Sequence, residues 1–312
     1  MKVKLIFASM LAMSLASCNN DNEPTTPADG EIAAKIVADI DHVATRASGD
    51  SWAGNDRIGV STLPGTRTDY TNIPYKWDGT KFNADGNTIY FQSAEPVTFR
   101  AYYPFAGTSG TSAGVISAVT DAQAQKDLPA IDFLFASGAT TDKTSPTVKF
   151  TGSASFGHRM SQVTLTFEEG NGVELTGKLT GYSLNGLILK GGFHTEDGVA
   201  QASAGESAVN LAITLENVTV TNKKYTAAPV ILFPQEVTDG KIVLEVTVDG
   251  NTYKATLTLP DADEDGTPDT ALKAGYNYTY SVRVNKTELE IGNAEISPWN
   301  EVAGDSGDAV MQ

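Results

Sequence analysis

The stretch Lys241-Ile-Val-Leu-Glu-Val-Thr-Val-Asp-Gly-Asn-Thr-Tyr-Lys-Ala-Thr-Leu-Thr-Leu259 alternates apolar and polar side chains on both sides of Asp249-Gly250. Alternation with a period of two is the pattern of a strand with one buried face. Asp-Gly supplies the positive φ angles that a tight hairpin turn requires. The stretch therefore predicts an antiparallel hairpin with arms at 241–248 and 251–259, and it indicates an all-β chain.

The rest of the chain repeats this pattern in shorter form. Runs of β-branched and aromatic residues alternate with Gly, Asn and Asp, which favour turns. A second hairpin is expected around Asp78-Gly79, between arms at 75–77 and 80–82. Further strands are expected at 87–91, 97–103, 162–167, 211–220, 228–233 and 276–284. One short helix is expected at 118–126, where Ala and Gln are good helix formers.

The length of 312 residues is enough for two domains, each with its own core of two packed sheets. Turn-rich sequence at 144–155 marks the expected boundary, and a new series of strands starts at Phe156. The predicted organisation is a signal peptide at 1–17, a polar tether at 18–30, an N-terminal β-sandwich at 31–155 and a C-terminal β-sandwich at 156–312.

The formal charge is −16, and no cluster of Lys and Arg stands out. Nucleic-acid binding depends on clustered basic residues that neutralise phosphates. The composition therefore argues against a nucleic-acid partner. Loss of Lys2 and Lys4 with the signal peptide would make the mature chain more acidic still.

The N-terminus has the features of a lipoprotein signal peptide. Two lysines precede an apolar run at 5–15 that is too short to span a bilayer. The run ends in Leu15-Ala16-Ser17-Cys18, which resembles a bacterial lipobox, in which the cysteine is acylated and becomes the new N-terminus. The alternative is an ordinary signal peptide with an incidental cysteine. Cys18 is the only cysteine in the chain, so no intramolecular disulfide can form.

Signatures of an enzyme do not emerge from the sequence. We expect no Gly-x-Ser-x-Gly nucleophile elbow, no Gly-Lys-Ser/Thr phosphate loop and no His-Glu-x-x-His metal motif. The histidines His42, His158 and His194 lie far apart in sequence. His158 stands beside Phe156 and Met160 at strand spacing, so we expect a packed, hydrogen-bonded structural histidine and no catalytic residue.

One acidic loop has the spacing of calcium ligands. Its carboxylates occupy positions one, three, five and nine, with glycine at six: Asp261, Asp263, Asp265, Asp269 and Gly266. Position twelve is Leu272, where a bidentate Glu would be wanted, and no helices are expected on either side. The loop is therefore either a Ca²⁺ site or a solvated acidic turn, and no other cofactor is expected.

Several local patterns occur in an order that resembles the fimbrillin family of Bacteroides-type bacteria, the subunits of type V pili. They are Thr45-Arg46-Ala47, 52–60 (Trp-Ala-Gly-Asn-Asp-Arg-Ile-Gly-Val), 101–105 (Ala-Tyr-Tyr-Pro-Phe), 132–136 (Asp-Phe-Leu-Phe-Ala), 156–161 (Phe-Gly-His-Arg-Met-Ser), 232–235 (Leu-Phe-Pro-Gln), 272–280 and 296–300. The resemblance implies two transthyretin-like β-sandwich domains, export as a lipoprotein, and assembly by strand exchange after proteolysis at an arginine.

Residues 31–43 fit the strand that such proteolysis would remove. The apolar residues Ile36, Ala38 and Ile40 stand at a period of two, and Thr45-Arg46-Ala47 follows. An alternative is an ordinary first strand followed by a surface arginine. The expected donor strand lies near the C-terminus and contains Leu289, Ile291, Ile296 and Trp299.

The sequence thus predicts a non-enzymatic pilus subunit, or an associated fimbrial component, located at the outer membrane and in the fimbrium. Its expected partners are other fimbrial subunits, the outer membrane through the lipid anchor, and an arginine-specific protease that cuts between Arg46 and Ala47. The competing hypothesis is a lipid-anchored surface protein that binds glycans or host proteins and does not polymerise.

Overall fold

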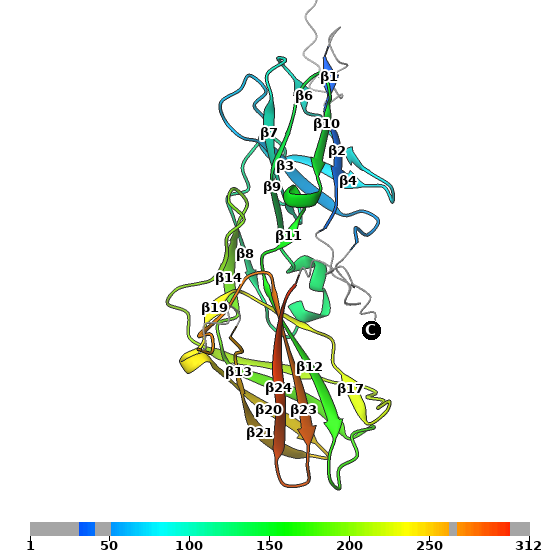
Figure 1. Cartoon of the computed structure of the whole chain (residues 1–312), viewed down its shortest axis with the longest axis vertical. Helices are drawn as coiled ribbons and strands as arrows, with labels where there is room; N and C mark the ends of the chain where they lie inside the picture. Colours follow the sequence, from blue (N-terminus) through cyan, green and yellow to red (C-terminus); the bar gives the residue numbers. More distant parts are fainter. Residues whose placement is uncertain (1–30, 41–50, 262–266, 300–312) are drawn as a thin grey trace, which may run out of the picture.

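The computed structural model describes residues 31–40, 51–261 and 267–299. These residues form strands joined by turns, with four short 3₁₀ helices among them, so the all-β prediction is confirmed. None of the helices in these ranges is long and apolar enough to cross a membrane. Figure 1 shows an elongated molecule with two lobes stacked along its long axis.

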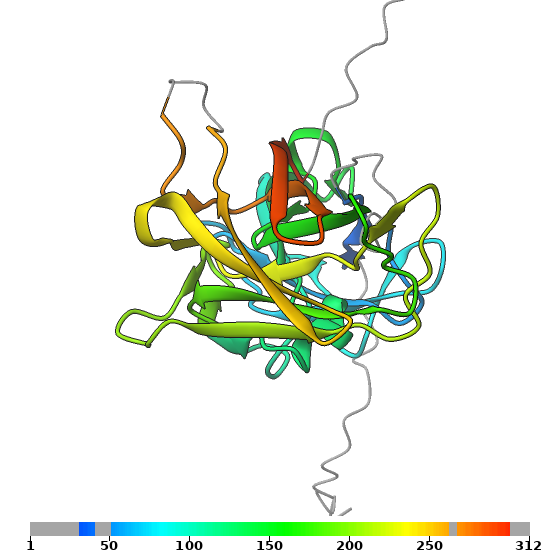
Figure 2. The same ribbon diagram turned by 90° about the horizontal axis from the view of Figure 1, so that it is seen from below.

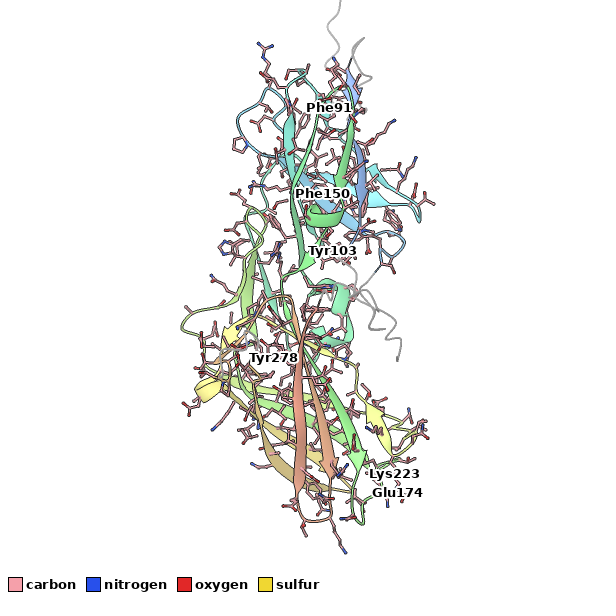
Figure 3. All side chains as sticks on the ribbon, in the orientation of Figure 1. Phe91, Tyr103, Phe150, Glu174, Lys223 and Tyr278 are labelled. Atoms are coloured by element: carbon pink, nitrogen blue, oxygen red, sulfur yellow. The ribbon has the colours of Figure 1, made fainter. Side chains whose placement is uncertain are left out.

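The N-terminal lobe is built on a sheet of eight strands in the order β10-β2-β5-β4-β3-β7-β9-β11. Its core gathers large apolar side chains, among them Phe91 and Phe150, which are labelled in the upper lobe of Figure 3. The strands are β2 (Lys35–Ala38), β3 (Arg57–Thr62), β4 (Ile73–Trp77), β5 (Phe82–Ala84), β7 (Val97–Tyr103), β9 (Leu134–Thr141), β10 (Thr147–Phe150) and β11 (Gly157–His158). A small antiparallel pair, β1 (Ile32–Ala33) and β6 (Tyr90–Phe91), extends this lobe.

The C-terminal lobe packs two sheets around a second core that includes Tyr278 (Figure 3). One sheet has the order β17-β12-β23-β24 with β18 also paired to β12, and the other has the order β16-β13-β20-β21. Figure 2, seen from below, shows them as two layers. The strands are β12 (Ser161–Glu169), β13 (Leu179–Leu187), β16 (Val209–Thr214), β17 (Lys224–Thr226), β18 (Val230–Leu232), β20 (Lys241–Val248), β21 (Asn251–Thr258), β23 (Tyr276–Val284) and β24 (Leu289–Pro298).

The hairpin expected at 241–259 is present as β20 and β21, paired from Lys241↔Thr258 to Val248↔Asn251. Asp249 and Gly250 both have positive φ, 51° and 76°, as a type I′ turn requires. The apolar side chains Ile242, Leu244 and Val246 are fully buried, which fixes the register of the hairpin.

Two small sheets lie near the waist between the lobes. One has the order β15-β14-β8 and the other pairs β19 with β22. Their strands are β8 (Val115–Val119), β14 (Lys190–His194), β15 (Ala200–Ala202), β19 (Gln235–Glu236) and β22 (Ala271–Leu272). Because β8 comes from the N-terminal half and β14 from the C-terminal half, the two halves share a sheet. A third apolar cluster, with Tyr102, Phe133, Phe193 and Phe233, joins them further.

The helix expected at 118–126 is wrong over its first part. Val119 ends strand β8, and only a single 3₁₀ turn, η1 (Ala124–Lys126), follows it. The other 3₁₀ turns are η2 (Leu128–Ala130), η3 (Gly152–Ala154) and η4 (Thr238–Gly240). The β-branched residues that precede Ala118 pair with β14, and this tertiary pairing overrides the helix propensity of Ala and Gln.

Candidate functional site

The strand expected to be removed by proteolysis lies inside the N-terminal sheet. β2 is parallel to β10 on one side and meets β5 on the other, with Ile36 opposite Phe82. Backbone hydrogen bonds toward β10 start at the first residue of β2 and continue past its last, because the Lys35 N–H donates to the Pro146 carbonyl at 2.8 Å and the Asp39 N–H to the Phe150 carbonyl at 2.9 Å. Loss of this strand would therefore open the sheet between two neighbours, leaving unpaired backbone groups on both sides.

One face of this strand supplies a row of core side chains. The row consists of Ala34, Ile36, Ala38 and Ile40, which are at most 5% exposed. The residues between them, Lys35, Val37 and Asp39, face solvent. The strand therefore fills a groove with side chains of alternating small and large size, and any replacement strand has to fill the same groove.

Trp52 follows the proposed cleavage point in sequence and contacts the strand that precedes it. Its indole Nε1–H donates to the Ala38 carbonyl at 2.8 Å. Its ring makes edge contacts with Phe82 and Phe156, with ring centroids 5.0 and 5.1 Å apart. In the sequence, Trp52 belongs to one of the family patterns, but nothing there indicates its hydrogen bond to the strand.

A cavity of about 270 Å³ lies beside the end of this strand, lined by Ile40, Trp52, Tyr103 and Asp132 among others. Tyr103 donates a hydrogen bond to Asp56 Oδ1 at 3.1 Å. Burial, reinforced by the negative charge of Asp56, raises the pKa of Tyr103 well above its usual value. Tyr103 is labelled near the waist of the molecule in Figure 3.

The residues of the proposed processing steps lie outside the described residues. These are Cys18, the predicted lipidation site, and Arg46 and Ala47, the predicted cleavage site. Lipidation and cleavage therefore stay predictions.

Three of the four predicted donor residues belong to β24, an edge strand that is antiparallel to β23 in its own lobe. Leu289, Ile291 and Ile296 are half-buried against the C-terminal core. Trp299 follows β24 and is 7% exposed. The alternating pattern that suggested a donor thus also serves the sheet of its own subunit.

His158 is buried and hydrogen-bonded, as the sequence predicted. Its Nδ1–H donates to Asp132 Oδ1 at 2.8 Å, and its ring stacks on Trp299 with centroids 4.1 Å apart. Asp132 comes shortly before β9, His158 lies on β11, and Trp299 comes after β24, so this cluster joins the two lobes at the waist. The three residues stood in separate sequence patterns, and only the fold brings them together.

The acidic loop is described only in part, because Asp263 and Asp265 fall outside the described residues. Asp269 forms an ion pair with Lys273, with Oδ1 and Nζ 2.7 Å apart. Among the residues that the structure describes, no group of three or more His, Cys, Asp or Glu side chains could hold a metal. Calcium binding by Asp261, Asp263, Asp265 and Asp269 stays a prediction.

The segment Gly110-Thr-Ser-Ala-Gly114 matches the Gly-x-Ser-x-Gly pattern of hydrolases, so the expectation that the chain lacks this pattern is wrong. Its Ser112 hydroxyl donates to Glu196 Oε1 at 2.8 Å, in an exposed loop before β8. A nucleophile elbow requires a turn from strand to helix and a histidine partner for the serine. Neither feature is present around Ser112 in the described structure, so the match does not indicate a hydrolase.

Comparisons with known proteins agree with these features. The fimbrillin-like family model matches residues 45–299. A Bacteroides uniformis protein named "Putative fimbrium subunit Fim1C" is 28% identical, and the match covers 99% of each chain. The crystal structure of a "putative cell adhesion protein" from Bacteroides ovatus is similar with a TM-score of 0.71 and 28% identity, covering 88% of this chain and 99% of that chain. A second one, from Bacteroides uniformis, shares the fold with a TM-score of 0.64 at 24% identity, covering 88% of this chain and 100% of that chain. The chain therefore belongs to the fimbrillin-like family.

Proposed function

We propose that this chain is a structural subunit of a fimbrium, exported as a lipoprotein through Cys18 and assembled by strand exchange after cleavage between Arg46 and Ala47. The fimbrial role rests on the family match and on the name of the Bacteroides uniformis relative. One observation of the structure carries the mechanism. Strand β2, which precedes Arg46 in the chain, is an internal strand of the sheet and carries a row of buried side chains. Its removal would therefore expose a neighbouring strand on each side, whereas removal of an edge strand would expose only one.

Cleavage after Arg46 would turn this strand from a part of the chain into a bound peptide. A bound peptide can be displaced by another segment that offers the same backbone hydrogen bonds and a matching row of side chains. Without either strand, the groove would expose apolar core and unpaired backbone between β10 and β5, a state that favours pairing with another chain. Assembly in this scheme is driven by the repair of that sheet.

The cleavage step is tested with Arg46→Ala, and Arg67→Ala is the matched control because Arg67 is an exposed arginine in a turn. Both variants are treated with an arginine-specific protease and then followed by gel electrophoresis and electron microscopy. We expect cleavage at residue 46 and filaments from the Arg67→Ala protein, and neither from Arg46→Ala. Filaments from uncleaved Arg46→Ala protein would overturn the mechanism, and cleaved wild-type protein that stays monomeric would favour a non-polymerising surface protein.

The donor is tested with two truncations, because β24 also completes the C-terminal lobe. One variant lacks residues 286–312, and the other ends at residue 299 and keeps all of β24. Each is mixed after cleavage with full-length protein, and its folding is checked by urea unfolding. If β24 is the donor, the variant ending at 299 still donates and the longer truncation does not.

The anchor is tested with Cys18→Ala, followed by acyl labelling and membrane fractionation. We expect loss of the acyl label and release from the membrane fraction. Unchanged acyl labelling of the Cys18→Ala protein would refute lipidation at Cys18, and it would leave the strand-exchange proposal unaffected.

A further inference from the structure

Strand β8 (Val115–Val119) has one unpaired edge. In the described part of the chain, β14 is its neighbouring strand, and β8 ends the sheet β15-β14-β8. The Thr120 N–H donates to the Leu189 carbonyl and the Thr195 N–H to the Gly114 carbonyl, so the bonds toward β14 belong to even-numbered residues of this segment. The N–H and C=O groups of Val115, Ser117 and Val119 therefore point away from β14.

The side chains at the same three positions are exposed. Val115 is 52% and Val119 41% exposed, and Ser117 between them also faces solvent. On the opposite face, Ile116 and Ala118 pack against the apolar cluster at the waist, which holds the strand in place. The edge is thus rigidly presented, and Figure 1 shows β8 beside β14 at the waist of the molecule.

Strand β8 itself contains neither the charged side chains nor the proline that protect many open edges from pairing with another chain. Proteins commonly block an open edge with charged side chains, proline or a covering loop. No charged residue occurs from 101 to 120, although the chain as a whole carries a formal charge of −16. Two acidic copies repel each other over most of their surfaces, so an uncharged edge is where they can approach at the smallest electrostatic cost.

The pattern of the edge fits a second copy of itself. Its outward residues read Val115, Ser117, Val119, which is the same in both directions. An antiparallel partner strand centred on Ser117 places each Val115 opposite Val119 of the other copy, and a two-fold axis satisfies both edges equally. We propose that β8 pairs antiparallel with β8 of a second copy about a two-fold axis at Ser117, extending the small sheet across two molecules.

Five residues per strand bury far less than the roughly 1,600 Å² of a standard stable interface. The pairing is therefore weak between free molecules and becomes effective where many copies are held together, since linked contacts raise the effective concentration. This places its role in lateral association of copies that are already gathered on a surface or in a filament. It uses neither β2 nor β24, so it is independent of strand exchange.

The test uses cysteine crosslinking in full-length protein that carries Cys18→Ala and Arg46→Ala, so that strand exchange is blocked and one thiol is added at a time. Ser117→Cys places two thiols opposite each other at a spacing that a disulfide can bridge, about 5.5 Å between Cα atoms. Val209→Cys is the control, because Val209 is 45% exposed on another strand. Under mild oxidation we expect Ser117→Cys to form disulfide dimers at least about ten times faster than Val209→Cys.

The register is tested separately. Val115→Cys alone should crosslink slowly, because its two copies lie roughly 13 Å apart along the strands at about 3.4 Å per residue. A mixture of Val115→Cys and Val119→Cys proteins should crosslink quickly. Adding Val115→Glu and Val119→Glu to the Ser117→Cys protein should abolish the fast reaction, with the melting temperature checked because both side chains are exposed.

Equal rates for Ser117→Cys and Val209→Cys would overturn the proposal. Fast crosslinking of Val115→Cys with itself would overturn the two-fold register.

Discussion

The contribution of buried side chains to the binding of β2 in its groove can be measured at Ile36. This residue lies at the centre of β2, is 2% exposed, and is opposite Val148 and Phe82. Replacing a buried Ile with Ala removes apolar contacts and leaves a cavity, which costs about 2–5 kcal/mol. At about 1.4 kcal/mol per factor of ten, the lower figure already changes an equilibrium constant roughly 30-fold.

Val37 provides the matched control on the same strand. It is the next residue and is 43% exposed, so Val37→Ala should change the free energy of unfolding by only about 0.5 kcal/mol or less. Both variants keep the strand in the chain and alter a single side chain. The difference between them isolates the contribution of the buried row.

Two assays read this difference. Urea unfolding of the intact proteins, followed by the fluorescence of Trp52 and the other tryptophans, gives the free energy of unfolding. In protein cleaved after Arg46, gel filtration gives the rate at which the peptide that ends at Arg46 is released. We expect wild-type and Val37→Ala to retain the peptide, and Ile36→Ala to release it at least about ten times faster. Equal losses of stability, or equal release rates, in the two variants would show that the buried row does not hold the strand.

Four further outcomes are expected. Asp132→Ala leaves the Nδ1–H of buried His158 unpaired and should cost about 1–3 kcal/mol in thermal or urea unfolding, and the double variant with His158→Leu should recover part of it. Gly250→Ala forces a side chain into a turn position with φ of 76° and should cost about 1–2 kcal/mol by the same measurement, while an alanine at an ordinary exposed position should not. Burial raises the pKa of Tyr75 from 10.0 to about 12, so the unfolded chain loses its proton first, and the contribution to stability that is present below pH 10 should be lost as the pH rises through about 12; a urea midpoint that stays constant over this range would contradict it. If the loop at 261–269 binds Ca²⁺, a chelator should lower the melting temperature relative to excess calcium, and identical melting curves would remove the site.

The elements that the sequence predicted well are those whose signals are local. The strands expected at 97–103 and 276–284 are present as β7 and β23 with those bounds, and the hairpin at 241–259 is present with its turn. In these segments the period of two, the β-branched residues and the flanking turns all agree. The strand expected at 211–220 instead ends at Thr214, and Asn217 takes a φ of 53°, which lies in the left-handed region and outside the β region.

Pairing between distant segments could not be predicted. The alternation of Ile36, Ala38 and Ile40 indicated a buried face, yet nothing in it shows that β2 lies inside a sheet and is parallel to β10. The segment that forms β8 contains β-branched residues that favour a strand and alanine that favours a helix. Its conformation is decided by pairing with β14, about 70 residues away in sequence. Asp132 and His158 were both noticed, but their contact depends on the packing of β11 against β9.

The strand that leaves the groove and the strand predicted to replace it start from different free energies. The strand at 32–40 fills a groove in its own lobe and, after cleavage, has no covalent tie to hold it there. β24 stays covalently attached and pairs with β23, and the chain after it is fixed by Trp299, whose N–H donates to the Gly275 carbonyl at 2.5 Å and whose ring stacks on His158. Donating β24 would therefore break its pairing with β23 in order to complete the N-terminal sheet of another subunit. The free energy gained by the exchange is then only the difference between these two pairings. If donation starts beyond Trp299, β24 stays paired and the full gain remains. In that case the variant that ends at residue 299 should fold normally and accept a strand but fail to donate one, whereas donation by that variant would show that β24 leaves its own sheet and is the donor that the sequence predicts.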